Sequence, residues 1–433
     1  MDSRRFPMKR WFTLGIIMLV IPLTSYTQGL QENTPSKTVD LMKGISPTLT
    51  VQPIVPASTA TLAAFDRFAL ELLRESLPAE HNLLISPLSV HLALGMTLNG
   101  ARGNTALEML STLGDSKLGI QDINTASRYW LNSITTKDKN TTVSIANSVW
   151  FDQRYSPSTE FLQTNANYFT AGVRKLDFAD AGTLAVINKW VSDATEGTIQ
   201  KIVERLEPDA LMVLINTVYF LSDWAAPFDP GETYDRTFYT PDGEITTAFM
   251  SKLGRVAYLK GQDAKGIALP YANPRFVFFA LMPNDRSGLQ EWLDDRKPQT
   301  FLRDIRNLVA NPTFTRVDLS IPKFEASYED SLVNELGRMG MSEAFQASMA
   351  DFSGMSAQAT KDLYIGDVIH KTYIRVDEKG TEAAAATAVV MVATAMAFDG
   401  ITLVFDRPFC YGILDIATGL PLFLGLMEYP EEP

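Results

Sequence analysis

The spacing of hydrophobic positions changes along the chain, from helical repeats early on to short apolar runs later. From residue 58, apolar side chains recur every three or four positions, at Phe65, Phe68, Leu72 and Leu73. This spacing predicts an amphipathic helix. In NLLISPLSVHLALGMTLNGA, Ser86 precedes Pro87, a pair typical of an N-cap and first turn, and predicts a second helix with a largely apolar face. A further helix is predicted over INKWVSDATEGTIQKI.

Later segments are short and rich in β-branched and aromatic residues, which favours strands. They are SIANSVWF, MVLINTVYF, FVFFALMP and RVDLSIPKF. Several are almost wholly apolar, as strands covered on both faces are. The last two strands, in GITLVFDRPFCYGILDI and GLPLFLGLMEYP, are joined by a turn at Thr418-Gly419. Early helices followed by many strands indicate an α+β fold in one compact unit.

The first residues read as a targeting segment followed by a linker. A basic start, Arg4 to Arg10, precedes an apolar run from Trp11 to Leu23. This is typical of a secretory signal peptide, residues 1–27, cleaved near Thr27; an uncleaved anchor is the alternative. Residues 28–57 lack periodicity and predict a flexible N-terminal tether, so the folded domain covers 58–433. We therefore expect a secreted, extracellular protein, or one of the periplasm or cell envelope if it is bacterial.

The composition argues against several classes of binding partner. The chain has 433 residues, 46% of them hydrophobic, and a formal net charge of -12. This balance argues against nucleic acid or an anionic membrane as a partner. We see no dense basic cluster on the early helices and expect no glycosaminoglycan site. With three histidines and one cysteine, we expect no metal and no cofactor.

The segment EKGTEAAAATAVV, Glu378 to Val390, allows two interpretations. Alanine is the best helix former, so a helix is the simpler one. However, valine and threonine follow in VVMVATAMAF, and Glu382 is the only charge between Gly380 and Phe398. Alternate residues from Thr381 to Met391 are all small or apolar, so a strand could bury one face and leave its single charge outside.

These segments together resemble the serpins, the family of serine protease inhibitors. VDEKGTEAAAAT is similar to the serpin reactive-loop hinge, and NLLISPLSVHLALGMTLNGARGNT to the second helix of the family. The other matching segments, in family order, are INKWVSDATEGTIQKI, LINTVYFLSDWAAPF, LSIPKFEASYEDSLVNELGRMGMSEAF, LYIGDVIHKTYIRVDEKG and FDRPFCYGILD. The resemblance implies a single serpin domain with a large central, mostly antiparallel sheet, two further sheets, eight or nine helices, and an exposed reactive loop at about 378–400.

The resemblance also implies a mechanism and a set of site residues. A serpin is a suicide substrate: the protease forms an acyl-enzyme on the loop, which then inserts as a strand into the central sheet. The implied hinge is Glu378, Gly380, Thr381, Glu382, Ala383, Ala384, Ala385, Ala386 and Thr387. The implied shutter, where strands part, is Ser86, Ser89, Asn216 and His370, and the implied breach, where the loop enters, is Trp224, Lys323 and Glu378. A small uncharged residue at Thr381 favours the inhibitory type.

Two ways of locating the scissile bond give different residues. Counting the family's usual distance forward from Gly380 gives Thr394-Ala395, and counting backward from Pro408 gives a bond nearer Ala397. Thr394 and Ala395 are the first candidates, with Met396 and Ala397 as alternatives. None is basic, which favours elastase-like or subtilisin-like targets over trypsin-like enzymes. Papain-like cysteine proteases are an alternative class of target. The expected complex is a covalent 1:1 complex of a monomer with the protease.

Two rival interpretations remain. One is a non-inhibitory serpin acting as a binding, carrier or chaperone-like protein. The other is a hydrolase using Ser86 with His91 or His370, but no nucleophile-elbow motif surrounds Ser86, and SPLS is better explained as a helix start. We therefore expect an inhibitor that is not an enzyme.

Overall fold

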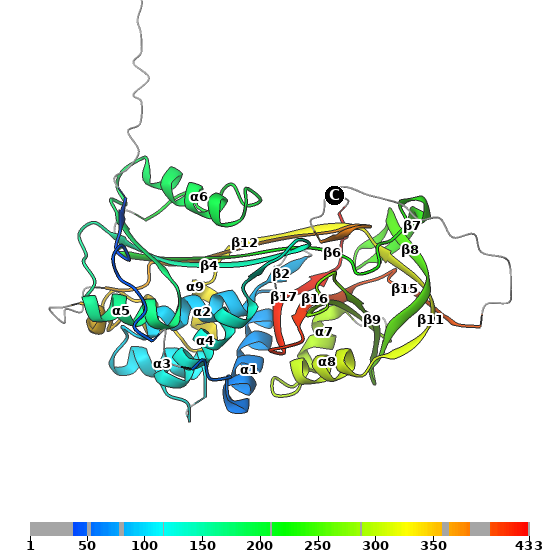
Figure 1. Ribbon diagram of the computed structural model, residues 1–433, viewed down its shortest axis with the longest axis horizontal. Helices are drawn as coiled ribbons and strands as arrows, with labels where there is room; N and C mark the ends of the chain where they lie inside the picture. The colour runs from blue at the N-terminus through cyan, green and yellow to red at the C-terminus, as the bar shows by residue number, and fades with distance from the viewer. Residues whose placement is uncertain are drawn as a thin grey trace, which may run out of the picture. The chain divides into compact units, whose positions relative to one another are not determined.

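A computed structural model describes residues 38–49, 53–77, 82–115, 117–207, 210–285, 288–356, 363–381 and 399–431. The α-helices of this part of the chain are α1 (Thr59–Glu75), α2 (Pro87–Leu98), α3 (Gly103–Leu113), α4 (Ile120–Ile134), α5 (Thr159–Tyr168), α6 (Thr183–Ala194), α7 (Leu289–Asp294), α8 (Phe301–Ala310) and α9 (Val333–Arg338) (Figure 1). The strands up to the middle of the chain are β1 (Val39–Asp40), β2 (Leu83–Ile85), β3 (Thr136–Lys137), β4 (Thr141–Asp152), β5 (Gly172–Leu176), β6 (Met212–Asp223), β7 (Thr233–Thr240), β8 (Gly243–Lys260) and β9 (Ala264–Pro270). The later strands are β10 (Phe276–Pro283), β11 (Thr313–Pro322), β12 (Phe324–Ser331), β13 (Asp367–Val376), β14 (Gly380–Thr381), β15 (Ile401–Val404), β16 (Phe409–Asp415) and β17 (Leu420–Met427).

The first two predicted helices form as expected. Ser58 caps α1 by accepting a hydrogen bond from the Thr61 amide, which satisfies one of the amides that a helix start leaves free. Ser86 caps α2 in the same way, and every residue of α2 is buried. The third predicted helix is shorter than INKWVSDATEGTIQKI: α6 ends at Ala194, after which Glu196 (φ 50°) and Gly197 (φ 90°) turn the chain.

The large central sheet has the order β1-β5-β4-β6-β14-β13-β12, with β3 added beside β4. Most neighbours are antiparallel, as expected; β4 with β5 and β13 with β6 are parallel. Strands β6 and β13 pair directly at one end, where Val213–Thr217 faces Asp367–Lys371. At the other end β14 lies between them, pairing with β6 on one side and β13 on the other. The sheet is therefore closed at one end and holds a short extra strand at the other.

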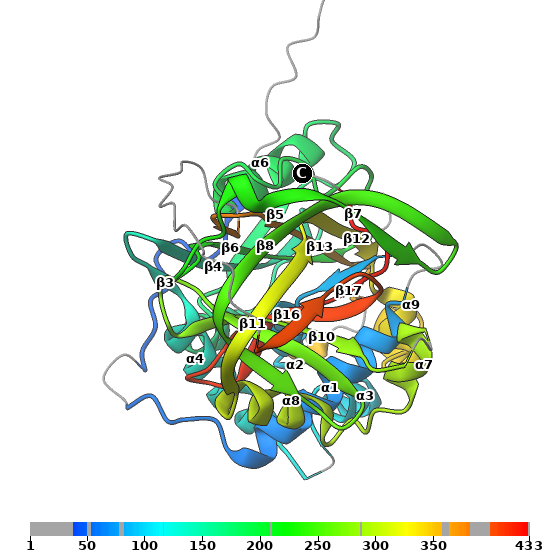
Figure 2. The same cartoon turned by 90° about the vertical axis from the view of Figure 1, so that its right-hand side faces the viewer.

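A second sheet has the order β15-β11-β8-β9-β10-β16-β17-β2, with β7 beside β8. The prediction named two further sheets. In the described residues they are continuous, because the 18-residue strand β8 runs through both regions; Figure 2 shows β8 beside β11. Strands β10, β16 and β17 are buried along their whole length, which explains why their sequences are almost wholly apolar.

The helices cover the central sheet on opposite sides. In Figure 1, α6 lies above the long strands, and α1, α2 and α4 lie below them. Beneath α6 a small core joins Trp150, Ile187, Val191, Ile215 and Ile369. The larger core contains residues of α1 and α2 together with the second sheet. Strand β6 is thus buried on both faces over most of its length, whereas one face of β13 is half-buried at Lys371, Tyr373 and Arg375. The polar groups that are buried on these strands need a partner inside the protein.

The predicted tether requires a correction over residues 38–49, because this stretch is docked on the domain. Strand β1 extends the central sheet by pairing with β5. Thr48 donates two hydrogen bonds, from its amide (2.7 Å) and its hydroxyl (3.1 Å), to Oδ1 of Asn167 on α5. Arg128 of α4 donates to the Leu49 carbonyl. These contacts explain how a segment without periodicity becomes ordered. The predicted signal peptide lies outside the described residues, and none of the helices described is long and apolar enough to cross a membrane.

Candidate functional site

A buried polar cluster lies where β6 and β13 pair directly, next to the start of α2. The Ser86 amide donates to Nε2 of His370 at 3.1 Å, and Nδ1 of His370 lies 2.5 Å from Oδ1 of Asn216. Asn216 and His370 are paired residues in the β6–β13 register. This imidazole therefore links α2 to both strands at the point where they would have to separate.

The two bonds fix the protonation of His370. Because Nε2 accepts from an amide, the proton is on Nδ1, which donates to Asn216. The side chain is fully buried, and burial lowers the pKa of His370 to about 3. The ring is neutral at any pH near neutrality, and its hydrogen bonds hold the two strands and α2 together.

Ser89 reaches a residue that the sequence analysis did not single out. Its hydroxyl donates to Oδ1 of Asn147 at 3.3 Å, and Asn147 on β4 lies opposite Asn216 on β6. Nδ2 of Asn216 is buried and has no hydrogen-bond partner in the part of the chain that the structure describes. We call Ser86, Ser89, Asn147, Asn216 and His370 the shutter cluster. It brings together all four residues expected at the shutter and adds Asn147.

At the opposite end of β6, Trp224 holds the turn that leads into β14. Its indole Nε1 donates to the Asp377 carbonyl (2.8 Å) and its amide to the Lys379 carbonyl (2.7 Å). The Phe228 amide donates to the Glu378 carbonyl at 2.7 Å. Three consecutive carbonyls are thus bound by one short segment after β6. The turn before β14 is fixed from outside as well as by its own bonds.

Glu378 and Lys323, expected as a pair, are in contact. Nζ of Lys323 lies 3.1 Å from Oε2 of Glu378, and the Thr233 hydroxyl donates to Oε1 at 2.9 Å. Burial alone would raise the pKa of Glu378, but hydrogen bonds from its own amide, Lys323 and Thr233 outweigh it and lower that pKa. The carboxylate is therefore ionised at neutral pH and joins the hinge to β7 and to the start of β12.

The first two hinge residues that form β14 are already part of the sheet. Gly380 pairs with Asp223, and Thr381 pairs with Ser222 and Val376. A Cβ on Gly380 would lie 2.2 Å from the Ser222 carbonyl oxygen, so only glycine allows this approach. The Thr381 side chain is fully buried, and its hydroxyl lies 2.6 Å from the Tyr271 hydroxyl.

The remaining predicted positions lie outside the described residues. They are Glu382, Ala383, Ala384, Ala385, Ala386 and Thr387 of the hinge and Thr394, Ala395, Met396 and Ala397 at the scissile bond. Two residues of the site were missed: Asn147, whose register opposite Asn216 gives it its role, and Tyr271, which is 110 positions from Thr381. Asn147 lies in a strand that also carries Ser144 and Ser148, so its polarity alone did not mark it. No sequence signal pointed to Tyr271.

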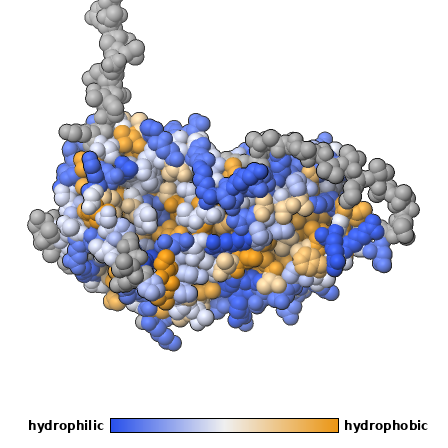
Figure 3. Space-filling view, viewed as in Figure 1, coloured by the Kyte–Doolittle hydropathy of each residue, from blue (hydrophilic) through white to orange (hydrophobic). Residues whose placement is uncertain are grey.

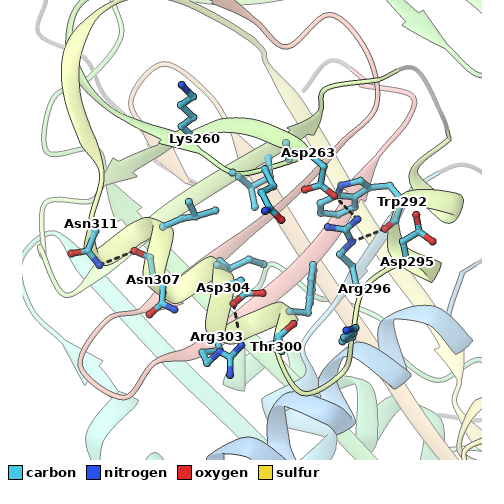
Figure 4. A pocket seen from close by; sticks show the side chains of 18 residues that line it. Lys260, Asp263, Trp292, Asp295, Arg296, Thr300, Arg303, Asp304, Asn307 and Asn311 are labelled. Atoms are coloured by element: carbon cyan, nitrogen blue, oxygen red, sulfur yellow. Dashed lines mark hydrogen bonds and ion pairs between the residues drawn. The ribbon is translucent and has the colours of Figure 1, made fainter.

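A surface pocket of about 810 Å³ lies elsewhere, between α8 and the turn after β8. Figure 4 shows two ion pairs among the side chains that line it. Arg296 lies over the Trp292 ring and 2.5 Å from Asp263, and Arg303 is 3.5 Å from Asp304. No group of three metal-ligating side chains occurs among the residues described.

Comparison with known proteins places this architecture. The family model described as "Serpin (serine protease inhibitor)" matches residues 63–430. An uncharacterized serpin-like protein of Thermococcus kodakarensis is 31% identical over 95% of this chain and 93% of its own. The human leukocyte elastase inhibitor is 29% identical over 85% of this chain and 99% of its own.

Solved structures agree. The native state of tengpin, a thermophilic serpin, is 32% identical with a TM-score of 0.82, covering 91% of this chain and 100% of tengpin. Human thyroxine-binding globulin with bound thyroxine is 26% identical with a TM-score of 0.77, covering 87% of this chain and 100% of that one. The chain belongs to the serpin family, the family of serine protease inhibitors.

Proposed function

We propose that this protein is a secreted suicide inhibitor of elastase-like or subtilisin-like serine proteases, and not an enzyme itself. The observation that carries the proposal is the position of β14. Gly380 and Thr381 already lie between β6 and β13, and the residues that follow them in sequence are small. A loop that continues in this direction has a path into the sheet, and small side chains enter with little steric or desolvation cost.

The chemistry is that of the protease. Its serine hydroxyl attacks the carbonyl of one residue among Thr394–Ala397. The peptide C–N bond breaks, an ester forms on the serine, and the new amino terminus leaves with the proton. The acyl-enzyme is then bound to the end of a loop that is free to move into the sheet.

The proposed insertion has an energetic cost and an energetic gain. The direct pairing between Val213–Thr217 and Asp367–Lys371 must break, along with the His370–Asn216 contact. In exchange, each inserted residue gains ladder bonds to β6 on one side and to β13 on the other. The native arrangement is kinetically trapped in this scheme, because the barrier is the separation of β6 from β13.

A second function is favoured by one observation. A pocket of about 480 Å³ beside α8 has a mainly apolar lining that includes Ala257, Ala268, Pro270, Val277 and Val309. Apolar residues are visible near β9 on the surface in Figure 3. Such a lining suits an apolar small molecule, and a structural neighbour is a thyroxine carrier. The alternative is a non-inhibitory serpin that carries a ligand.

A protease-trapping assay combined with a ligand-binding assay distinguishes the two functions. The purified protein is mixed with pancreatic elastase or subtilisin and analysed on denaturing gels, with protease blocked at its serine as the control. A denaturation-resistant complex only with active protease supports inhibition. Cleavage without a complex by both enzymes, together with saturable binding of a fluorescent apolar anion that Ala268→Phe abolishes, would favour the carrier. Mass analysis of the secreted protein tests the proposed export and cleavage near Thr27.

A further inference from the structure

The Thr381 hydroxyl is held by a single side chain from a distant part of the chain. Its Oγ1 lies 2.6 Å from the Tyr271 hydroxyl. Both side chains are fully buried, and in the part of the chain described no second hydrogen-bond partner occurs for either hydroxyl. Each hydroxyl therefore depends on the other, because a buried polar group without a partner is costly.

Tyr271 is itself held rigidly. Its ring stacks on the Trp224 ring, with centroids 4.6 Å apart and an interplanar angle of 11°. It also contacts the Phe220 ring edge-on, with centroids 4.8 Å apart. Trp224 in turn binds the Asp377 carbonyl through its indole nitrogen. One aromatic stack therefore contacts the chain on both sides of Gly380, at the Asp377 carbonyl before β14 and at the Thr381 side chain within it.

We propose that Tyr271 is a positioning residue that selects a hydroxyl at residue 381 and keeps β14 in the sheet of the uncleaved protein. This inference rests on the proposed insertion of the loop. Its site is narrow, because Gly380 lies against the Ser222 carbonyl and Thr381 has no exposed surface. A charged side chain at residue 381 would be buried next to the Tyr271 hydroxyl, with no opposite charge there to compensate it.

The consequence is a strand that is already started. Ordering the first residues of a new strand costs conformational entropy before ladder bonds compensate for it. Because β14 is docked before a protease binds, this entropy has already been lost in the uncleaved protein. Insertion then only extends an existing strand. Loss of the Tyr271 contact should leave more time for hydrolysis of the acyl-enzyme, so more inhibitor molecules are cleaved for each protease trapped.

The test is a double-mutant cycle with Tyr271→Phe and Thr381→Val, read by amide hydrogen exchange of the Gly380–Thr381 segment and by the stoichiometry of inhibition of pancreatic elastase. Each single substitution should speed exchange of this segment about tenfold, because it leaves one buried hydroxyl without a partner. The double variant should exchange no faster than either single one. Thr381→Ser keeps a hydroxyl and should restore slow exchange.

Matched controls come from buried hydroxyls that have no partner among the residues described. Tyr411→Phe and Thr247→Val each remove such a group and should leave exchange and stoichiometry unchanged. Equal effects of Tyr271→Phe and Tyr411→Phe, or additive effects in the cycle, would overturn the proposal. If the unmodified protein traps no protease, the proposed function fails, and exchange alone still decides whether Tyr271 holds the hinge.

Discussion

Nδ1 of His370 donates to Oδ1 of Asn216, 2.5 Å away, across the two strands that must separate for a loop to enter the sheet. The same ring accepts from the Ser86 amide. A neutral imidazole can do both at once because one of its nitrogens donates and the other accepts. The contact therefore stabilises the direct pairing of β6 and β13, and the proposed opening of the sheet would break it.

Replacing His370 with leucine should strongly destabilise the native protein. The Ser86 amide and the side-chain Oδ1 of Asn216 would both lose a buried partner, at about 1–3 kcal/mol each. Urea unfolding should show a free energy of unfolding lower by about 2–6 kcal/mol. Thr217→Val on β6, next to Asn216, removes a buried hydroxyl with no partner in the described residues and is the control. Equal stability of the two variants would mean that the His370 bonds do not hold the sheet.

Stability should fall as pH decreases below about 6.5. Burial lowers the pKa of His370 to about 3 and that of His91 to about 4, both from 6.5. Below 6.5 the unfolded chain binds protons at these rings and the folded one does not, so folding loses up to about 1.4 kcal/mol per pH unit for each ring. The loss should continue to about pH 4 for His91 and pH 3 for His370.

Chemical unfolding between pH 8 and pH 4 measures this slope. His91→Gln should remove about half of it, because one of the two titrating rings is gone. A free energy of unfolding that stays constant down to pH 4, or rises, would contradict the buried neutral state of both rings.

The pair of Lys323 and Glu378 should matter more than an exposed ion pair. Their side chains are 24% and 11% exposed, whereas those of Lys189 and Asp193 are 75% and 64% exposed. Removing one partner of a sheltered pair leaves an uncompensated charge. Lys323→Met should lower the midpoint of thermal unfolding measurably, and Lys189→Met should shift it very little. Similar shifts of the unfolding midpoint in both variants would show that the sheltered Lys323–Glu378 pair stabilises the protein no more than an exposed ion pair does.

Gly380→Ala should expel β14 from the sheet. The added Cβ would meet the Ser222 carbonyl oxygen at 2.2 Å, a contact that the backbone of β6 cannot relieve without moving. Amide exchange of Gly380–Thr381 should become fast, and the number of inhibitor molecules consumed per protease should rise. Gly254→Ala on β8, where a Cβ has open space, is the control. Slow exchange in Gly380→Ala would contradict the placement of β14.

Much of the fold and part of the site followed from local patterns. Apolar runs predicted β6 and β10, and the Ser86-Pro87 pair predicted the start of α2. The family resemblance supplied the shutter and breach residues, which the structure brings into two clusters. What was missed depends on register or on distance along the chain. Asn147 acquires its role only by lying opposite Asn216, and Tyr271 reaches Thr381 through tertiary packing.

The docked segment 38–49 shows the same limit. Its residues carry no helical or strand period, and β1 is only two residues long. It is ordered by groups on other elements, such as Asn167 and Arg128. Likewise, α6 stops at Ala194 where the chain adopts positive φ at Glu196 and Gly197, although its sequence could continue a helix.

The most direct test of the central claim is the thermal stability of the protein before and after cleavage in the loop. Limited proteolysis that cuts once between Thr394 and Phe398, verified by the mass of the released peptide, produces the cleaved form. If the loop inserts between β6 and β13, new ladder bonds form on both its sides, and the midpoint of unfolding should rise by at least about 10 °C. An unchanged or lower midpoint would show that the cleaved loop stays outside the sheet, which contradicts the proposed mechanism.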